Sequence, residues 1–154
     1  MLSHLKAQNR HIENGIRTVE QTLKKLADAS LDEKGRCRIQ YGPIGMHVVA
    51  DAEHNLLVVK AFTNFLPDPN SGKVLPLYYH LLDMNDAPQT GLAYYSIVAS
   101  EEIGLEQDVI SVETKRPIAG VSHEEFIACL EAVGEVAQTA IAQLAEKFDA
   151  PPIP

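Results

Sequence analysis

The stretch RCRIQYGPIGMHVVADAEHNLLVVKAF, residues 36–62, decides the fold. Its first six residues alternate between polar and apolar, which is the pattern of a strand with one face in the core and one in water. After the turn at 42–45, the run Met46–Ala50 indicates a second strand, and Leu56–Phe62 indicates a third that is more continuously apolar. Three short strands joined by tight turns predict an antiparallel meander.

Two segments with helical periodicity lie on either side of this meander. Residues 3–28 carry a single apolar stripe, and Gly15 lies inside it, where a glycine should weaken the helix by about 1 kcal/mol relative to alanine. Residues 66–73 contain two prolines, Asn and Gly and predict an exposed loop. Leu75–Met84 then has apolar residues at helical spacing, so we expect a short apolar helix.

A final helix begins at Ser122, whose hydroxyl is expected to cap the first turn while Glu125 completes a capping box. The small Ala137 in the middle of its stripe should let a neighbouring element approach closely. The helix ends before Pro151 and Pro152, which cannot continue it. Its apolar stripe consists of Phe126, Leu130, Val133, Ala137, Ile141, Leu144 and Phe148.

Two further strands, 92–99 and 109–115, precede that helix and are separated by an acidic loop, 100–108. The element order is therefore α-βββ-α-ββ-α, with neither repeats nor a linker long enough to divide the chain. We expect one α+β domain over residues 1–154, with a five-stranded antiparallel sheet and helices packed on one face.

The charge and composition exclude several classes of function. The chain has 154 residues, 45% of them hydrophobic, and a net charge of −8, which disfavours a general nucleic-acid binder. The first 30 residues carry a balance of +2, so the remainder carries −10. No stretch has the length and apolarity of a membrane span, and the first residues lack a secretory apolar region. The expected location is the cytoplasm, with neither membrane nor nucleic acid as a partner.

The strand 92–99 is apolar on both sides. Leu92, Tyr94 and Val98 share one side, while Ala93, Tyr95, Ile97 and Ala99 share the other. One layer of helices cannot bury both faces, so a partner subunit is the simplest cover.

Chemical motifs give little sign of catalysis. The six histidines have no metal-ligand spacing, the two cysteines form neither a disulfide framework nor a zinc motif, and no cofactor is predicted. A nucleophile hypothesis would combine Cys37 with His47 across the first hairpin. A turn centred between Gly42 and Pro43 pairs residue 37 with residue 48, however, and this register points His47 to the opposite face.

Four stretches between Leu81 and Phe148 carry a resemblance to a known family: LLDMN at 81–85, the strands LAYYSIVAS and VISVETKRPI, and SHEEFIACLEAVGEVAQTAIAQLAEKF at 122–148. Together with the element order, they resemble the type III secretion chaperone-like superfamily, which includes the Tir chaperone and YbjN types. The resemblance implies a small acidic homodimer that binds an extended, non-globular segment of a client polypeptide without nucleotide hydrolysis.

The resemblance also implies two sets of contact residues. In that superfamily the middle helix and the strand after it commonly form the dimer interface, whereas client grooves involve the first helix and the outer part of the sheet. The matching dimer-interface positions are Leu75, Tyr78, Tyr79, Leu82, Tyr94, Tyr95 and Ile97. The matching client-binding positions are Ile12, Ile16, Val19, Ile39, Tyr41 and Val48, which the apolar pattern assigns equally well to the core.

The leading hypothesis is a homodimeric, peptide-binding chaperone-like or adaptor protein without catalytic activity. A structural or regulatory dimerisation domain without a client is an alternative, as is a cysteine-dependent hydrolase that uses Cys37 and His47. The net charge of −8 would keep a binding surface soluble and would favour clients with basic segments.

Overall fold

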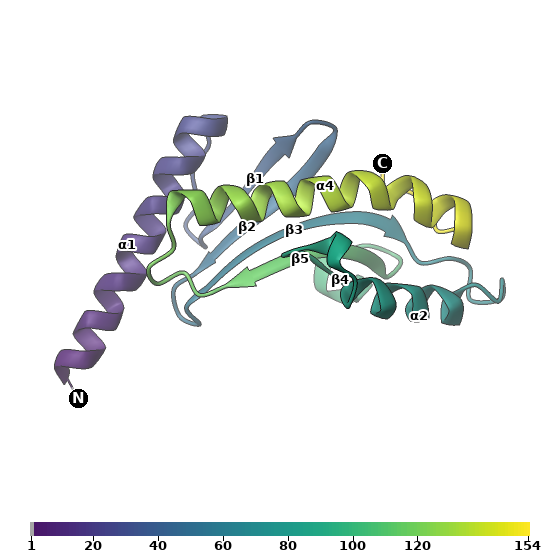
Figure 1. Cartoon of the computed structure of the whole chain (residues 1–154), viewed down its shortest axis with the longest axis horizontal. Coiled ribbons are helices and arrows are strands. Elements are labelled where there is room, and N and C mark those ends of the chain that lie inside the picture. The colour runs from purple at the N-terminus through teal and green to yellow at the C-terminus, as the bar shows by residue number, and fades with distance from the viewer. Residues whose placement is uncertain (1) are drawn as a thin grey trace.

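The computed structural model describes residues 2–154 and confirms the predicted order α-βββ-α-ββ-α (Figure 1). One single-turn helix, α3, lies in the acidic segment that was expected to be a loop, and a short 3₁₀ turn covers Pro88–Thr90. The elements are α1 (Leu2–Ala27), β1 (Arg36–Tyr41), β2 (Ile44–Asp51), β3 (Leu56–Phe65), α2 (Val74–Asn85), β4 (Tyr94–Val98), α3 (Ser100–Ile103), β5 (Val109–Arg116) and α4 (His123–Phe148).

The five strands form one antiparallel sheet in the order β1-β2-β3-β5-β4. The first hairpin has the register expected from its turn, because Cys37 lies opposite Val48. The chain leaves β3 through α2 and returns as β4 at the outer edge of the sheet. The sheet therefore has two free edges, β1 and β4.

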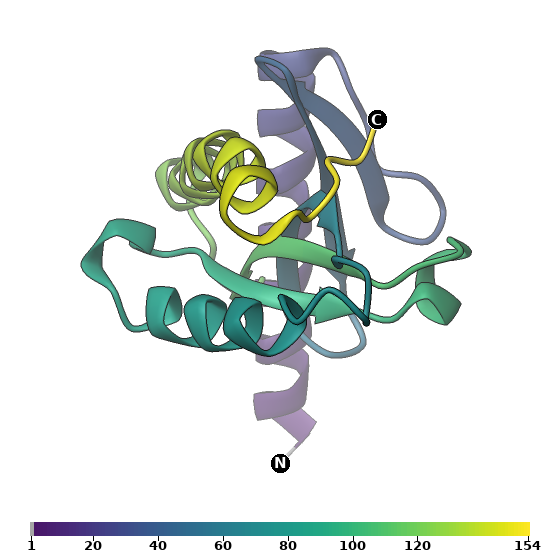
Figure 2. The same cartoon turned by 90° about the vertical axis from the view of Figure 1, so that its right-hand side faces the viewer.

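Helix α4 covers one face of the sheet and forms the main core with β3 and β5 (Figure 1). Its apolar stripe is buried as predicted at Phe126, Leu130, Val133 and Leu144. Figure 2 shows α2 beside α4, and the buried residues of these two helices belong to one core cluster. The Ser122 hydroxyl accepts a hydrogen bond from the Glu125 amide at 3.1 Å, which confirms the cap. The Glu125 carboxylate faces Arg116 instead of completing a capping box.

Small residues allow two close approaches between elements. Ala137 is fully buried as expected, but the closest contact on α4 is at Gly134, where a Cβ atom would overlap the Tyr41 ring. On α1, a Cβ atom at Gly15 would overlap the backbone carbonyl oxygen of Ile118. Gly15 therefore fixes how closely α1 packs against the segment between β5 and α4. The sequence predicted only a local weakness at this position.

The first half of α1 extends beyond the sheet, while its second half packs against the N-terminal part of α4 (Figure 1). Val19 and Leu23 are fully buried, whereas Leu5 is half exposed. The Thr22 hydroxyl lies 2.7 Å from the His123 ring nitrogen and joins the two helices. The predicted stripe thus contacts the core from Ile12 to Leu23, while Leu5 and Leu26 at its two ends are exposed.

Strand β3 continues three residues beyond its predicted end at Phe62 because of contacts that are distant in sequence. Asn64 is fully buried and donates hydrogen bonds to the carbonyl oxygens of Ile141, at 3.1 Å, and Ala150, at 2.9 Å. The segment after α4 then forms backbone hydrogen bonds with the end of β3, where the amide of Phe65 donates to the Pro151 carbonyl. Within residues 2–154, none of the helices is both long and apolar enough to traverse a membrane.

Candidate binding surfaces

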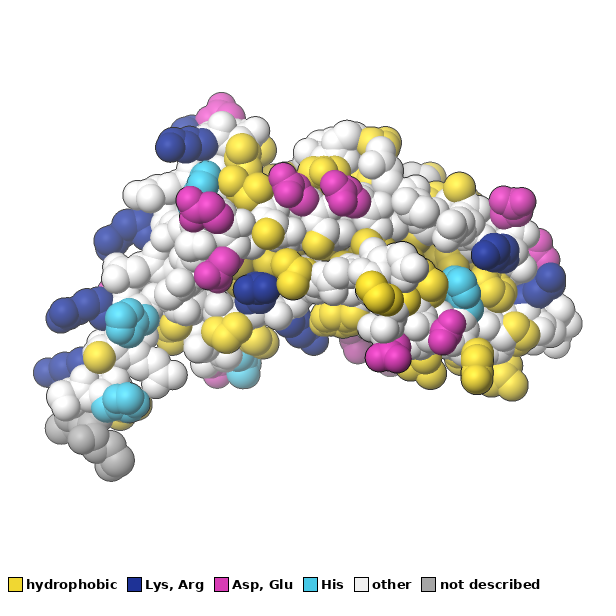
Figure 3. Space-filling view, in the orientation of Figure 1, with side chains coloured by type: hydrophobic (Ala, Val, Ile, Leu, Met, Phe, Trp, Pro, Cys, Tyr) yellow, Lys and Arg dark blue, Asp and Glu magenta, His cyan; other side chains and the backbone are white. Residues whose placement is uncertain are grey.

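Helix α2 has two apolar faces, one buried in the core and one exposed to solvent. Leu77 and Leu81 point into the core and are almost completely buried. Leu75, Tyr79 and Leu82, at spacings of four and three residues, lie on the opposite side with 77%, 78% and 71% of their surfaces exposed. Figure 3 shows hydrophobic side chains gathered over α2. We call Leu75, Tyr79 and Leu82 the α2 stripe. None of residues 2–154 covers this apolar surface.

The β4 positions expected at a dimer interface divide among three environments. Ile97 is partly exposed, at 37%, whereas Tyr95 is buried in the core cluster. Tyr94 points to the other face of the sheet, opposite Glu113, and burial together with the nearby Glu113 charge raises the pKa of Tyr94 to about 12. Tyr78 of α2 is partly buried near the segment 66–69. The outward-facing part of the predicted interface is therefore the α2 stripe with Ile97.

Asn85, which sequence reasoning assigned no role, closes part of the free edge of β4. Its side-chain amide donates to the Tyr95 carbonyl at 3.0 Å, and its side-chain oxygen accepts from the Tyr95 amide. An amide side chain thus takes the place of a neighbouring strand at this residue. Strand edges with free backbone groups are the places where further strands add. The only signal in the sequence was the Asn that ends LLDMN at 81–85.

Three of the six predicted client-binding residues belong to the interior of the protomer. Val19 and Val48 are fully buried, and Ile39 is 9% exposed. These three form the core with α4 and the neighbouring strands, so a bound client would not reach them in the folded protomer. Ile12, Ile16 and Tyr41 are partly buried, and they remain candidates for contact with a client.

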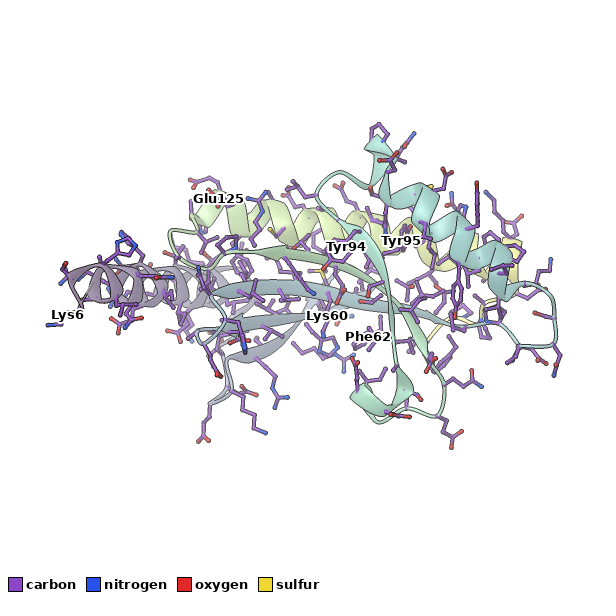
Figure 4. All side chains as sticks on the ribbon, turned by 90° about the horizontal axis from the view of Figure 1, so that it is seen from below. Lys6, Lys60, Phe62, Tyr94, Tyr95 and Glu125 are labelled. Atoms are coloured by element: carbon purple, nitrogen blue, oxygen red, sulfur yellow. The ribbon has the colours of Figure 1, made fainter. Side chains whose placement is uncertain are left out.

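The face of the sheet turned away from α4 carries a second candidate surface, seen from below in Figure 4. Strand pairing aligns side chains on this face in rows, because residues directly opposite each other point to the same side. The central row runs across all five strands as Arg38, His47, Lys60, Glu113 and Tyr94. No helix of the main core covers this face, since the buried apolar residues of β3 point to the α4 side.

Aromatic and basic side chains touch in the middle of this face. The ring centroids of His47 and Phe62 are 5.2 Å apart, and the Lys60 ammonium lies 5.7 Å from the centre of the Phe62 ring. An open groove of about 540 Å³ lies over these residues and is bounded on one side by Glu102 and Ile103 of α3. Burial, followed by the Arg38 and Lys60 charges, lowers the pKa of His47.

The hydrolase hypothesis requires Cys37 and His47 to lie together, and the strand register does not bring them together. Cys37 lies opposite Val48 and Arg38 opposite His47, so Cys37 and His47 point to opposite faces of the sheet. Burial, with the Asp32 charge, also raises the pKa of the Cys37 thiol and so disfavours the reactive thiolate. Among residues 2–154, no three His, Cys, Asp or Glu side chains gather into a metal-binding group.

Two histidines should make the stability of the fold depend on pH. Burial is the main cause of the lowered pKa of both His47 and His80. The ring centroids of His80 and Phe148 are 5.1 Å apart. Because the unfolded chain then binds more protons, stability is lost as the pH falls from about 6.5 through the folded-state pKa values.

We therefore expect the loss of unfolding free energy between about pH 7.5 and pH 5.5 to be smaller in the variant His47→Gln/His80→Gln than in the wild type, by about a few tenths of a kcal/mol per histidine after solvent screening. Urea unfolding at both pH values measures this difference. Asp51 raises the pKa of His54, so His54 changes the pH dependence of stability in the opposite sense, but it is present in both the wild type and the variant. Equal pH dependence in the two proteins would contradict the assignment.

Comparison with known proteins shows the fold. No family model matches the chain, and neither does any curated protein. Among solved structures, the ExsC–ExsE complex matches with a TM-score of 0.61 and 18% identity, over 82% of this chain and 92% of the matched one. YbjN from E. coli matches with a TM-score of 0.59 and 16% identity, over 90% and 95%. The Yersinia pestis type III secretion chaperone SycH, in complex with a fragment of YscM2, matches with a TM-score of 0.58 and 15% identity, over 81% and 98%.

The protein therefore has the fold of the type III secretion chaperones and of YbjN, the group that its sequence resembles.

Proposed function

We propose that the protein is a homodimeric chaperone-like or adaptor protein that binds a non-globular segment of a client polypeptide and carries out no catalysis. The observation that carries the proposal is the α2 stripe, formed by three large apolar side chains that are more than two-thirds exposed. A two-fold dimer would use the same stripe on both chains, so the three side chains of each chain would be buried against those of the other. Burying each leucine contributes roughly 1.5–3 kcal/mol before the entropy of association is subtracted.

Client binding is supported by the combination of fold and surface. The structures of SycH and ExsC that match this chain are complexes with a second polypeptide. In this protein the helices of the main core do not cover the sheet face turned away from α4. Strand β1 also forms an open edge of the sheet. An extended segment can add to such an open edge through main-chain hydrogen bonds, while its alternate side chains give selectivity.

The test of client binding uses a small globular protein in two forms, one native and one reduced and carboxymethylated so that it stays unfolded. Both forms carry a fluorescent label, and their anisotropy is followed as the wild-type chain is added. We expect the unfolded form to bind and the native form not to bind. Binding of neither form, while the chain is dimeric, would support a dimerisation domain without a client and would contradict the proposal.

A further inference from the structure

The sheet face turned away from α4 has a charge opposite to that of the chain as a whole. Strand register places Arg36, Val49, Val58 and Lys115 in the row beside the central one, which contains Arg38 and Lys60. Four basic side chains, half of the eight outside α1, therefore lie on one face of the sheet. The rest of the chain outside the first 30 residues is strongly acidic. We call Arg36, Arg38, Lys60 and Lys115 with Phe62 the basic sheet face.

Four carboxylates lie on or beside this face, and two of them are Asp51, which is hydrogen-bonded to His54, and Glu102, which borders the groove. Glu113 is only 6% exposed and lies between Lys60 and Tyr94 in the central row. Asp32 is within 3.6 Å of Arg36. Within residues 2–154, neither Arg38 nor Lys115 has a carboxylate within 4 Å. An approaching polypeptide therefore meets exposed cations, while the carboxylate at the centre of the face is buried.

The same face offers an apolar contact at its centre. Phe62 is partly buried between the His47 ring and the Lys60 ammonium, below the open groove of about 540 Å³. Rows of side chains on neighbouring strands are roughly 5 Å apart, and alternate residues of an extended segment are roughly 7 Å apart. Side chains at positions i, i+2 and i+4 of an extended segment point to the same side. Carboxylates at i and i+4 can thus reach the basic side chains while an apolar residue at i+2 contacts Phe62.

We propose that the basic sheet face binds an extended, acidic polypeptide segment that carries an aromatic or aliphatic residue among its carboxylates. The proposal rests on the proposed client-binding function and names the class of client. It differs from the expectation drawn from the net charge of −8, which favoured basic clients. The charge of the face itself determines which segments bind there, because exposed charges more than about 8–10 Å away are screened at physiological salt.

The test uses three fluorescein-labelled synthetic peptides in which a central phenylalanine takes the place of one glutamate, so that it lies on the same side of the extended peptide as the remaining glutamates. In one, glutamate alternates with valine, and in the other two serine or lysine replaces glutamate. We expect the glutamate peptide to bind at least about tenfold more tightly than the serine peptide, and this preference to shrink as salt is raised. The variant Arg38→Glu/Lys115→Glu should weaken binding of the glutamate peptide about tenfold. Both side chains are exposed, so the fold should be retained, which circular dichroism checks.

The matched control is Lys6→Glu/Lys24→Glu on α1, which makes the same change in charge away from the sheet and should alter affinity less than about twofold. Equal binding of the glutamate and serine peptides would overturn the acidic preference while leaving client binding intact. A single-stranded oligothymidylate that binds as tightly as the glutamate peptide would also overturn the proposal, in favour of a nucleic-acid site. If no peptide binds and the unfolded protein probe also fails, both this proposal and client binding are wrong.

Discussion

The double substitution Tyr79→Glu/Leu82→Glu is expected to convert the proposed dimer into monomers. Both side chains lie on the α2 stripe, more than two-thirds exposed in the protomer, so the substitution leaves the core of the protomer unchanged. In a two-fold dimer it would bury four carboxylates without partners, each at a penalty of several kcal/mol. Because a tenfold change in affinity corresponds to 1.4 kcal/mol, self-association should weaken by at least about 100-fold. Light scattering during size-exclusion chromatography measures the change in mass.

The matched control places the same substitutions on another exposed apolar pair, Leu5→Glu/Leu26→Glu on α1. These leucines are 51% and 57% exposed and lie on a different element from the α2 stripe. The control should remain dimeric. A dimer that survives Tyr79→Glu/Leu82→Glu and is lost in the control would locate self-association on α1 and would remove the observation that carries the proposed function.

Gly15→Ala is expected to destabilise the protomer by about 2 kcal/mol or more, although alanine is the better helix former by about 1 kcal/mol. The added Cβ atom would overlap the Ile118 carbonyl oxygen, and a backbone oxygen cannot rotate away as a flexible side chain can. Helix α1 must then move outward, which loosens the burial of Val19 and Leu23. Urea unfolding of the wild type and the variant measures the difference in free energy.

Asn14→Ala is the control for this substitution, because Asn14 is the exposed neighbour of Gly15 on the same helix. Alanine improves helix propensity there without meeting another segment, so stability should stay the same or rise slightly. If Gly15→Ala were as stable as Asn14→Ala, the close approach of α1 to Ile118 would not exist in solution.

The order of elements was predictable because α1, α4 and the first strands have a clear period in their apolar residues, whereas the single turn of α3 has none and was not predicted. The end of β3 was not predictable either, because Thr63 and Asn64 break the apolar run and yet are buried. Asn64 is held by the carbonyl oxygens of Ile141 and Ala150, which are about 80 residues away along the chain. Such a contact leaves no periodic signal in the local sequence. Gly15 was misread for the same reason, since its partner Ile118 belongs to a distant segment.

The candidate surfaces were predictable only in part. Leu75, Tyr79 and Leu82 were placed at a dimer interface by the family resemblance, which named Tyr78, Tyr94 and Tyr95 equally, although these three are buried or partly buried. Val19, Ile39 and Val48 could not be separated from surface positions, since an amphipathic stripe has the same spacing whether a core or a client covers it. The basic sheet face could not be predicted from the sequence, because only the strand register brings together Arg36, Arg38, Lys60 and Lys115.

In the proposed function, two copies of this chain together bind one non-globular polypeptide. Native mass spectrometry of the wild-type chain, mixed with the reduced and carboxymethylated probe, tests this most directly. The chain has a mass of 16.9 kDa. We predict a complex that contains two chains and one probe, and no complex with the native form of the same probe. A single chain without bound probe, at concentrations where the probe is in excess, would contradict the account.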